Sequence, residues 1–475
     1  MGMILISMMM RMFIDREYEL DFLEERYRSG RAELIIIYGR RGIGKTEIVK
    51  QFIRGKKAYY FFVTLEDLGT LLEGFLRVLG PPYDKLSVRG LEDFFEVLGD
   101  LASGERVVFV FDEFQRLLEV YRGALSLLQK VWDEKLRRTK IFLILVGSAV
   151  SVFERIGKSY ESPIYGRRTG MLEISEMDYW AARMFFPRYD EESRLFAYSV
   201  LGGVPLYLSL FSDSKTVEGN IVDQILSRGS ALYDEPEMLL LQETRDPTTY
   251  MSILKAISLG YTRFSEISDA SGVEKNKLSK YLNVLINRLK LVERETPIKE
   301  RGRGIYKIRN NFIRFWLRYV LPNKSLLEIG EADPVLRRII KEKHLIISHG
   351  FESVVKQFLL RINGSRIDNI PIRFDTIGRW WRRDIEIDLV AINEREKIAY
   401  FVECKYTNRP VSKKVLLDLM RKSEEFTWKK NVRKNIYMIF SKEGFSFPPE
   451  EDVILIDLTR MLKIANEIIK IRVIK

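Results

Sequence analysis

A lysine and a threonine close a glycine-rich stretch near the amino terminus, in an order suited to binding phosphate groups. The stretch reads LIIIYGRRGIGKT from Leu34 to Thr46, and the helix-forming run TEIVKQFI follows. Glycines let successive backbone N–H groups turn towards phosphates, while Lys45 would reach the β- and γ-phosphates and the Thr46 hydroxyl would hold Mg²⁺. The strand before the loop and the helix after it argue against a chance glycine-rich turn. We expect a nucleotide to be surrounded by Gly39, Arg40, Arg41, Gly42, Ile43, Gly44, Lys45 and Thr46.

Two carboxylates follow a later apolar strand, RVVFVF, which ends at Phe111. Asp112 is the expected metal residue, holding Mg²⁺ through the water shell of the ion, and Glu113 is the expected general base. The same letters would also fit an ordinary acidic turn in solvent. Their place behind a phosphate-binding loop favours nucleotide hydrolysis.

Two further residues are candidates for contacts with the terminal phosphate. Ser148 follows the apolar strand from Ile141 to Val146, and polar groups at the carboxyl ends of parallel strands lie where open α/β sheets bind ligands. An equally good interpretation makes Ser148 the cap of the next helix. Arg167, in PIYGRRTG, would stabilise phosphoryl charge in its own subunit or in a neighbour, which would require a homo-oligomer. The alternative is a solvated loop.

A second acidic set lies in the last third of the chain. Asp388 stands in DIEIDLVAI, and Glu403 and Lys405 stand in IAYFVECKY, where strand alternation puts the glutamate and the lysine on one face. Two carboxylates beside an ammonium group suit Mg²⁺ or Mn²⁺ acting on a phosphodiester, with Lys405 orienting or deprotonating a water. Glu352, on an amphipathic helix, would complete the metal shell. The alternative is a degraded site with solvated charges.

Composition limits the classes of function. The chain has 475 residues, of which 46% are hydrophobic, and a net charge of +12, so we expect about three domains and a polyanionic partner. Its single cysteine excludes an internal disulfide and suits a reducing cytoplasm. The chain has two histidines, five residues apart, so catalysis by a histidine side chain is not favoured. The apolar start is too short to span a bilayer, and no transmembrane segment is visible elsewhere.

The segment from Tyr261 to Arg309 predicts a DNA-binding module. Its helical runs and turn follow helix-turn-helix order, and a hairpin wing follows. It holds 12 basic and 6 acidic residues, so half of the excess positive charge lies in about a tenth of the chain. A module used only for packing remains the alternative. The expected DNA contacts are Lys275, Asn276, Lys277, Lys280, Arg301 and Arg303.

Two family resemblances can be stated from these motifs. GRRGIGKT, FVFDE, VGS, YGRRTG and LGGVPLYL together resemble the archaeal ATPase family of the STAND branch of AAA-like P-loop NTPases. That resemblance implies a five-stranded parallel sheet with the P-loop strand central, ATP as the nucleotide, and a nucleotide-controlled switch. The C-terminal motifs resemble the PD-(D/E)xK nucleases, specifically the domain of unknown function 234. Ile387 stands where many of those nucleases have proline.

We therefore expect an α/β protein with a P-loop AAA-like parallel sheet and helical lid, a winged helix, and a restriction-endonuclease-like α/β domain. The expected boundaries are 1–170 for the ATPase core, 171–245 for the lid, 246–322 for the winged helix and 335–475 for the nuclease-like domain, with a linker from Pro322 to Pro334. The expected function is ATP-dependent DNA processing by a Mg²⁺- or Mn²⁺-dependent nuclease. The alternatives are an ATP-switched DNA-binding regulator that does not cut, and a membrane-associated signalling ATPase.

Overall fold

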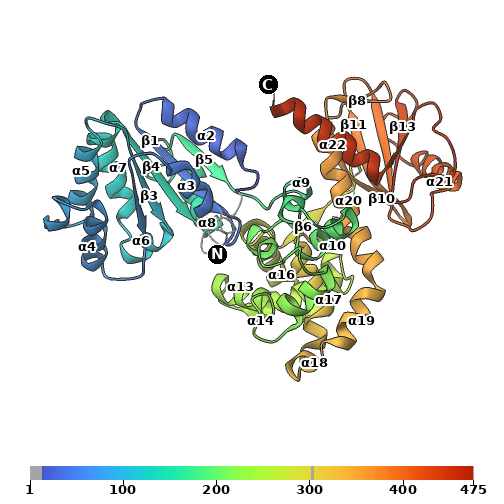
Figure 1. The fold of residues 1–475 in the computed structure, drawn as a ribbon, viewed down its shortest axis with the longest axis horizontal. Helices are drawn as coiled ribbons and strands as arrows, with labels where there is room; N and C mark the ends of the chain where they lie inside the picture. The colour runs from blue at the N-terminus through green and yellow to red at the C-terminus, as the bar shows by residue number, and fades with distance from the viewer. Residues whose placement is uncertain (1–12, 301–303, 474–475) are drawn as a thin grey trace, which may run out of the picture. The chain divides into compact units, whose positions relative to one another are not determined.

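The computed structural model describes residues 13–300 and 304–473, so Arg301 and Arg303 lie outside the described residues (Figure 1). The chain forms two compact units. Unit 1 runs to Met177 and includes Val204–Leu206 and Asn287–Leu289, and unit 2 holds the remainder of the chain. Within the described ranges, no helix has both the length and the apolar composition needed to cross a membrane.

Unit 1 is a parallel sheet covered by helices. Its strands are β1 (Glu33–Tyr38), β2 (Ala58–Phe62), β3 (Val107–Asp112), β4 (Ile141–Gly147) and β5 (Gly170–Glu173), arranged in the order β2-β3-β4-β1-β5. All four pairings are parallel. The P-loop strand β1 therefore lies inside the sheet, one strand from its edge.

Helices cover both faces of this sheet because its strands are apolar on both faces. Leu34 and Ile36 belong to a core with α4, α5, α7 and α8, whereas Ile35 and Ile37 belong to a core with α2 and α3. The helices of unit 1 are α2 (Glu17–Arg28), α3 (Lys45–Ile53), α4 (Leu68–Leu79), η1 (Tyr83–Lys85), α5 (Leu91–Leu101), α6 (Gln115–Val120), α7 (Ala124–Glu134), η2 (Leu136–Arg138) and α8 (Val150–Lys158).

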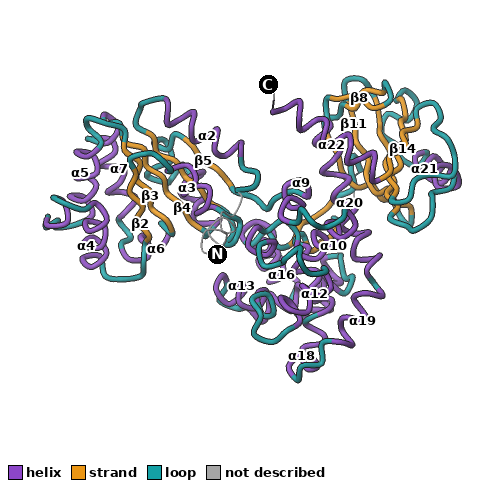
Figure 2. Tube along the Cα trace, in the orientation of Figure 1, coloured by secondary structure: helices purple, strands orange, loops and turns teal. Residues whose placement is uncertain are grey.

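The first part of unit 2 is largely helical (Figure 2). Its helices begin with α9 (Tyr179–Ala182), η3 (Arg183–Phe185), α10 (Glu191–Leu201), α12 (Val217–Ile221), η4 (Val222–Leu226) and α13 (Glu235–Glu243). The short helix α11 (Pro205–Leu208) lies between α10 and α12 in the chain, and its first two residues belong to unit 1. After the segment described next come α17 (Asn311–Tyr319), η6 (Leu321–Asn323), α18 (Lys324–Glu328), α19 (Asp333–Lys341) and α20 (Lys343–Ile362). The expected linker from Pro322 to Pro334 is therefore mostly helical, because Leu327 and Val335 are apolar enough to be buried.

Three helices and a hairpin follow α13 in the expected order. They are α14 (Pro247–Ser258), α15 (Phe264–Ser271) and α16 (Lys275–Asn283), continued by the π-helical turn η5 (Val284–Arg288), and then the antiparallel strands β6 (Val292–Glu295) and β7 (Ile305–Ile308). Gly272 ends α15 in the left-handed conformation, which glycine adopts without strain and which allows the sharp turn into α16.

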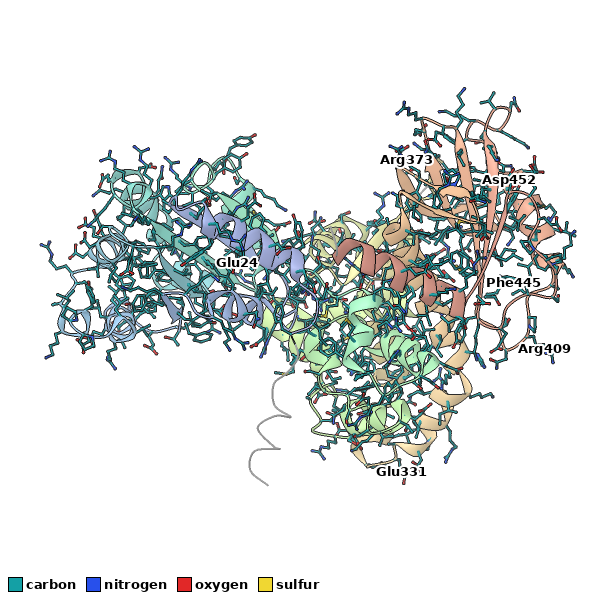
Figure 3. All side chains as sticks on the ribbon, turned by 45° about the horizontal axis from the view of Figure 1, so that its top comes forward. Glu24, Glu331, Arg373, Arg409, Phe445 and Asp452 are labelled. Carbon is teal, nitrogen blue, oxygen red and sulfur yellow. The ribbon has the colours of Figure 1, made fainter. Side chains whose placement is uncertain are left out.

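The second sheet of unit 2 is mixed. Strands β10 (Thr376–Arg382), β11 (Ile385–Asn393) and β12 (Ile398–Lys405) are antiparallel neighbours, and β13 (Lys434–Ser441) and β14 (Val453–Asp457) continue the sheet in parallel. A small hairpin, β8 (Ser365–Ile367) with β9 (Ile370–Ile372), precedes it, and α21 (Lys413–Ser423) and α22 (Leu458–Val473) complete the region. Lys434, where β13 begins, pairs with Asp452 at 2.7 Å. Asp452, which is labelled in Figure 3, directly precedes β14.

The loop of the β6–β7 hairpin is fixed to the first strand of this sheet. The backbone N–H of Ile298 donates to the carbonyl of Arg379 at 3.0 Å, and the indole of Trp380 donates to Glu300 at 3.3 Å. Lys299 pairs with Glu394 at 2.6 Å, and the Ile298 side chain packs against the core of the sheet. The hairpin therefore belongs to the same packed body as β10 and β11.

Candidate active sites

The glycine-rich loop joins β1 to α3 in a tight curve. Gly39 has φ of 153°, and a Cβ there would lie 2.3 Å from the carbonyl oxygen of Ile174, so no side chain fits. Gly44 is the left-handed N-cap of α3, which points the first N–H groups of the helix at the loop. Buried Lys45 donates to the carbonyls of Gly39 and Arg40 at 2.9 and 2.8 Å. These partners are neutral, so a phosphate competes well for the ammonium group.

Asp112, at the end of β3, is tied to the loop by hydroxyl groups. The hydroxyl of Thr46 donates to Oδ2 at 2.8 Å, the Tyr60 hydroxyl donates to the same oxygen, and the backbone N–H of Glu113 donates to Oδ1 at 2.9 Å. Burial and the nearby carboxylate raise the pKa of Tyr60 well above its usual value, so it remains a donor. The predicted pair of Thr46 and Asp112 is therefore brought together. Tyr60, in a run of aromatic residues, was missed.

Glu113 and Ser148 also meet, at the ends of β3 and β4. Ser148 donates to Oε2 of Glu113 at 3.1 Å, and the side-chain amide of Gln115 reaches the same oxygen and, at 3.4 Å, the serine hydroxyl. Helix α8 has Ala149 as its N-cap, with no capping hydrogen bond from a side chain, so Ser148 is not a helix cap. Gln115 was not predicted, although its position two residues after the proposed base is a usable signal.

The arginines near the loop have carboxylate partners. Arg40 pairs with Glu176 at 2.7 Å. Arg167 pairs with Asp133 of α7 at 2.7 Å and donates to the carbonyl of Pro163 at 3.1 Å, and this pairing lowers the pKa of Asp133. The described hydrogen bonds of Arg167 thus lead to α7 and its own loop, and its contact with a phosphate stays a prediction.

Asp388, Glu403 and Lys405 converge at one point of the second sheet. β11 and β12 pair Leu389 with Val402, so Asp388 and Glu403 are the next opposed residues. Asp388 accepts a hydrogen bond from the N–H of Cys404 at 2.8 Å, and Lys405 donates to Oε1 of Glu403 at 2.6 Å. Burial and the charges of Glu403 and Glu352 raise the pKa of Asp388 to about 7. Like charges held in a buried site have this effect.

One carboxylate oxygen of Glu403, Oε2, has no hydrogen-bond partner. The residue is 5% exposed, Oε1 contacts lysines, and Oε2 is buried without a hydrogen-bond partner. A buried carboxylate oxygen without a partner is costly unless a cation or donor reaches it. Hard carboxylate oxygens from Asp388 and Glu403 suit Mg²⁺ or Mn²⁺, so these residues fit such an ion. In the described ranges, no group of three or more His, Cys, Asp or Glu residues is arranged to hold a metal.

Basic side chains surround this pair. Arg379 of β10 lies 3.8 Å from Glu352 and also pairs with Glu386. Burial alone would lower the pKa of Arg379, but the charges of Glu352 and Glu386 raise it. Lys422 of α21 lies 3.6 Å from Glu403. Glu352 thus contacts an arginine here, and its place in a metal shell stays a prediction. The sequence carried no motif for Arg379 or Lys422.

The two histidines form hydrogen bonds with residues outside both candidate sites. His349 contacts the carbonyl of Leu345 in its own helix at 2.8 Å, and His344 contacts Asn408 at 2.8 Å. Burial lowers the pKa of His349. The two histidines thus have different hydrogen-bond partners.

Helix α16 presents polar residues to solvent. Leu278 and Leu282 are buried beneath it, while the predicted DNA contacts on this helix, Lys275, Asn276, Lys277 and Lys280, are exposed. Lys277 pairs with Glu274 at 3.2 Å, which is a weak surface interaction. The other two predicted contacts, Arg301 and Arg303, lie outside the described residues.

The parallel sheet, the glycine-rich loop with Lys45, and the acidic end of β3 define a P-loop ATPase. A family model described as an ATPase domain predominantly from Archaea matches residues 13–70 and 72–211, and a second, described as "Archaea bacterial proteins of unknown function" (DUF234), matches residues 316–418. The uncharacterized protein MJECL04 of Methanocaldococcus jannaschii is 36% identical over 422 residues, which cover 87% of this chain and 92% of that protein. The chain therefore belongs to this family of archaeal ATPases with a DUF234 domain.

The solved structures to which the chain is similar include two archaeal proteins. The Walker-type ATPase PABY2304 of Pyrococcus abyssi is 21% identical, with a TM-score of 0.49, over 64% of this chain and 96% of that one. The ORC2 protein of Aeropyrum pernix, in its ADPNP and ADP complexes, is 17% identical, with a TM-score of 0.44, over 68% of this chain and 93% of that one.

Proposed function

We propose that this ATPase processes DNA, and that its C-terminal domain hydrolyses a phosphodiester at Asp388, Glu403 and Lys405. The observation that carries the proposal is the buried, partnerless Oε2 of Glu403 beside Asp388. Retaining both groups in a fold costs stability, because Asp388 is a buried carboxyl group among like charges and Oε2 of Glu403 is buried without a hydrogen-bond partner. A divalent ion would offset the like charges and give Oε2 a partner.

In the nucleotide site, we propose that the loop amides and Lys45 bind the ATP phosphates. Bound Mg²⁺ would neutralise charge on the β- and γ-phosphates. Thr46 and Asp112 would hold the ion, and Tyr60 would keep Asp112 oriented. Glu113 would accept the proton of the attacking water, while Ser148 and Gln115, which both contact Glu113, would fix its position.

In the C-terminal site, the reaction joins a water oxygen to phosphorus and breaks one P–O ester bond, and the leaving oxygen takes up a proton. A bound Mg²⁺ or Mn²⁺ would polarise the phosphodiester and acidify the water. Lys405, held 2.6 Å from Glu403, would orient that water or take its proton. Asp388 and Glu403 would position the ion.

The proposed winged helix, formed by α14 to β7, would hold duplex DNA through the exposed basic residues of α16. The net charge of the chain supports a polyanionic partner. Because the hairpin loop is fixed to β10 at Ile298, DNA bound there would be held in a constant relation to the sheet that carries Asp388.

A second candidate is an ATP-switched DNA-binding regulator that does not cut. The observation in its favour is the 2.6 Å ion pair of Lys405 and Glu403, which stabilises the site without a metal ion. This regulator would use the same exposed helix α16 and the same nucleotide site.

Cleavage assays separate the two candidates. Wild-type protein, Asp388→Asn and Glu403→Gln would be incubated with plasmid, linear and branched DNA, with Mg²⁺ or Mn²⁺, with and without ATP. We expect the wild type to cut at least one substrate and both variants to be inactive while still hydrolysing ATP. If the wild type cuts none of them, the nuclease proposal is wrong and the regulator is favoured.

A further inference from the structure

Lys422 is a basic residue of the C-terminal site that no motif identifies. It lies in the last turn of α21, with Nζ 3.6 Å from Oε1 of Glu403 and 3.2 Å from Oδ2 of Asp418. Its side chain is 20% exposed, so the ammonium group is partly withdrawn from solvent at the edge of the carboxylate pair. Lys405 already holds the same Glu403 oxygen at the shorter distance of 2.6 Å.

Charge balance indicates what this second lysine can do. Lys405, Lys422 and Arg379 lie beside the acidic residues Asp388, Glu403 and Glu352. Lys422 also pairs with Asp418 and Arg379 with Glu386, so acidic side chains are in excess. A divalent ion at Asp388 and Glu403 would offset that excess and let a basic group at the edge of the pair turn to the charge of a phosphodiester.

The two lysines differ in how firmly Glu403 holds them. At 2.6 Å, Lys405 makes a charge-assisted hydrogen bond, whereas Lys422 at 3.6 Å is beyond ordinary hydrogen-bond length. A divalent ion on Glu403 would reduce the negative charge that attracts both groups. Lys422 would leave Glu403 more readily than Lys405 does, because its shorter contact is with Asp418 at 3.2 Å, and its long stem allows it to turn towards an incoming anion from there.

We propose that Lys422 binds a non-bridging oxygen of the phosphodiester at this site. The proposal rests on the proposed nuclease function, since it assigns the substrate phosphate to a named residue. A purely structural lysine, which only neutralises Glu403, would stabilise the fold without contributing to DNA binding. The two roles predict different results when the charge is removed.

The test compares Lys422→Gln, Lys422→Arg and the matched control Arg421→Gln in the full-length protein. Arg421 shares Asp418 with Lys422, at 2.7 Å, but its side chain is 73% exposed. Binding of a fluorescein-labelled DNA duplex would be measured by anisotropy with Ca²⁺ and with EDTA, and cleavage would be measured with Mn²⁺. Circular dichroism would check that each variant folds.

With Ca²⁺, Lys422→Gln is expected to raise the Kd for DNA roughly tenfold, as for loss of one charge-assisted contact. Lys422→Arg restores most of the affinity, and Arg421→Gln changes little. With EDTA, all four proteins bind alike at this site, because Lys422 then stays between Asp418 and Glu403. In the Mn²⁺ assay, Lys422→Gln raises KM for DNA more than it lowers kcat.

The possible outcomes separate the inference about Lys422 from the nuclease function. If the wild type cuts DNA and Lys422→Gln binds as the wild type does with Ca²⁺, Lys422 is structural while the nuclease function stands. If Lys422→Gln lowers kcat with no change in KM or Kd, the lysine acts only on Glu403. If the wild type does not cut, but Ca²⁺ tightens DNA binding only when Lys422 is present, the phosphate contact stands and the nuclease function fails. If neither DNA cleavage nor Ca²⁺-dependent DNA binding is seen, the nuclease proposal and the inference about Lys422 are both wrong.

Discussion

The two candidate phosphate sites of this protein differ in the partners of their charged groups. In unit 1, Lys45 donates to backbone carbonyls, and Asp112 accepts hydrogen bonds from hydroxyls and an N–H group. In the C-terminal sheet, Glu403 contacts the charged group of Lys405 directly, and Asp388 lies beside other carboxylates. On our proposal, the site in unit 1 therefore accepts its ligand with little rearrangement of charge, whereas the C-terminal site binds a cation before it accepts an anion.

This difference can first be tested at Lys45. Replacing it with alanine removes the ammonium group that would neutralise the transferring phosphate, so we expect ATP hydrolysis to fall roughly a thousandfold. Phosphate release in the presence of Mg²⁺ measures the change. Lys50→Ala is the control, because Lys50 is exposed on the same helix and pairs with Glu47. A fall of similar size in the control, or normal hydrolysis by Lys45→Ala, would contradict the assignment.

The second test concerns the stability cost of the C-terminal site. Because the pKa of Asp388 is raised to about 7, the folded state holds its proton more tightly than the unfolded chain. The free energy of unfolding therefore falls as pH rises towards 7, and the penalty is complete above 7. Asp388→Asn, measured by thermal melting at pH 8 with EDTA, should gain roughly 2 to 4 kcal/mol while losing cleavage.

Asp418→Asn provides the contrasting control. Arg421 and Lys422 lower the pKa of Asp418, so its carboxylate stabilises the folded state at neutral pH. This variant should lose stability slightly, in the opposite direction to Asp388→Asn. If both substitutions destabilise the protein at pH 8, Asp388 is not the strained carboxylate that we infer.

A smaller effect is expected on helix α16. Lys280→Ala removes one exposed positive charge, and should weaken DNA binding a few-fold and reduce the slope of log Kd against log salt by about one. Lys255→Ala, an exposed lysine on α14, is the control and should leave the slope unchanged. Equal slopes for wild type and Lys280→Ala would mean that DNA does not contact this face.

The smallest effect is expected at Tyr60. Tyr60→Phe keeps the ring and removes the hydroxyl that contacts Asp112, so the Mg²⁺ concentration for half-maximal ATP hydrolysis should rise a few-fold, as for one hydrogen bond of about 1 to 2 kcal/mol. Tyr59→Phe is the matched control, because Tyr59 stacks on Phe109 instead. If the two variants have the same Mg²⁺ dependence, Tyr60 does not orient Asp112.

The sequence predicted the first site better than the second because of how each is encoded. The P-loop is contiguous, and strand Val107–Asp112 carries both carboxylates, so spacing and apolar character are sufficient. Tyr60 is hidden in AYYFF, where each aromatic residue fits a buried strand. Its contact with Asp112 depends on β2 and β3 being neighbours in the sheet, and the amino-acid sequence alone does not specify the order of the strands.

In the C-terminal site, adjacent strands revealed Asp388, Glu403 and Lys405, but the surrounding charges come from other elements. Arg379 lies on β10 and Lys422 on α21, and neither belongs to a local pattern. The attachment of Ile298 to β10 was also missed, because a hairpin wing predicts DNA contact and carries no signal for packing on a sheet. These contacts arise from packing between elements that are far apart in the sequence.

One measurement tests the central claim most directly, namely that the C-terminal sheet holds a divalent ion between Asp388 and Glu403. Crystals of the protein would be soaked in Mn²⁺ and anomalous scattering recorded at the manganese edge. We expect one manganese peak within coordination distance of Oε2 of Glu403 and the carboxylate of Asp388. The account would be contradicted if crystals at saturating Mn²⁺ showed manganese at Asp112 but no manganese density at the carboxylates of Asp388 and Glu403.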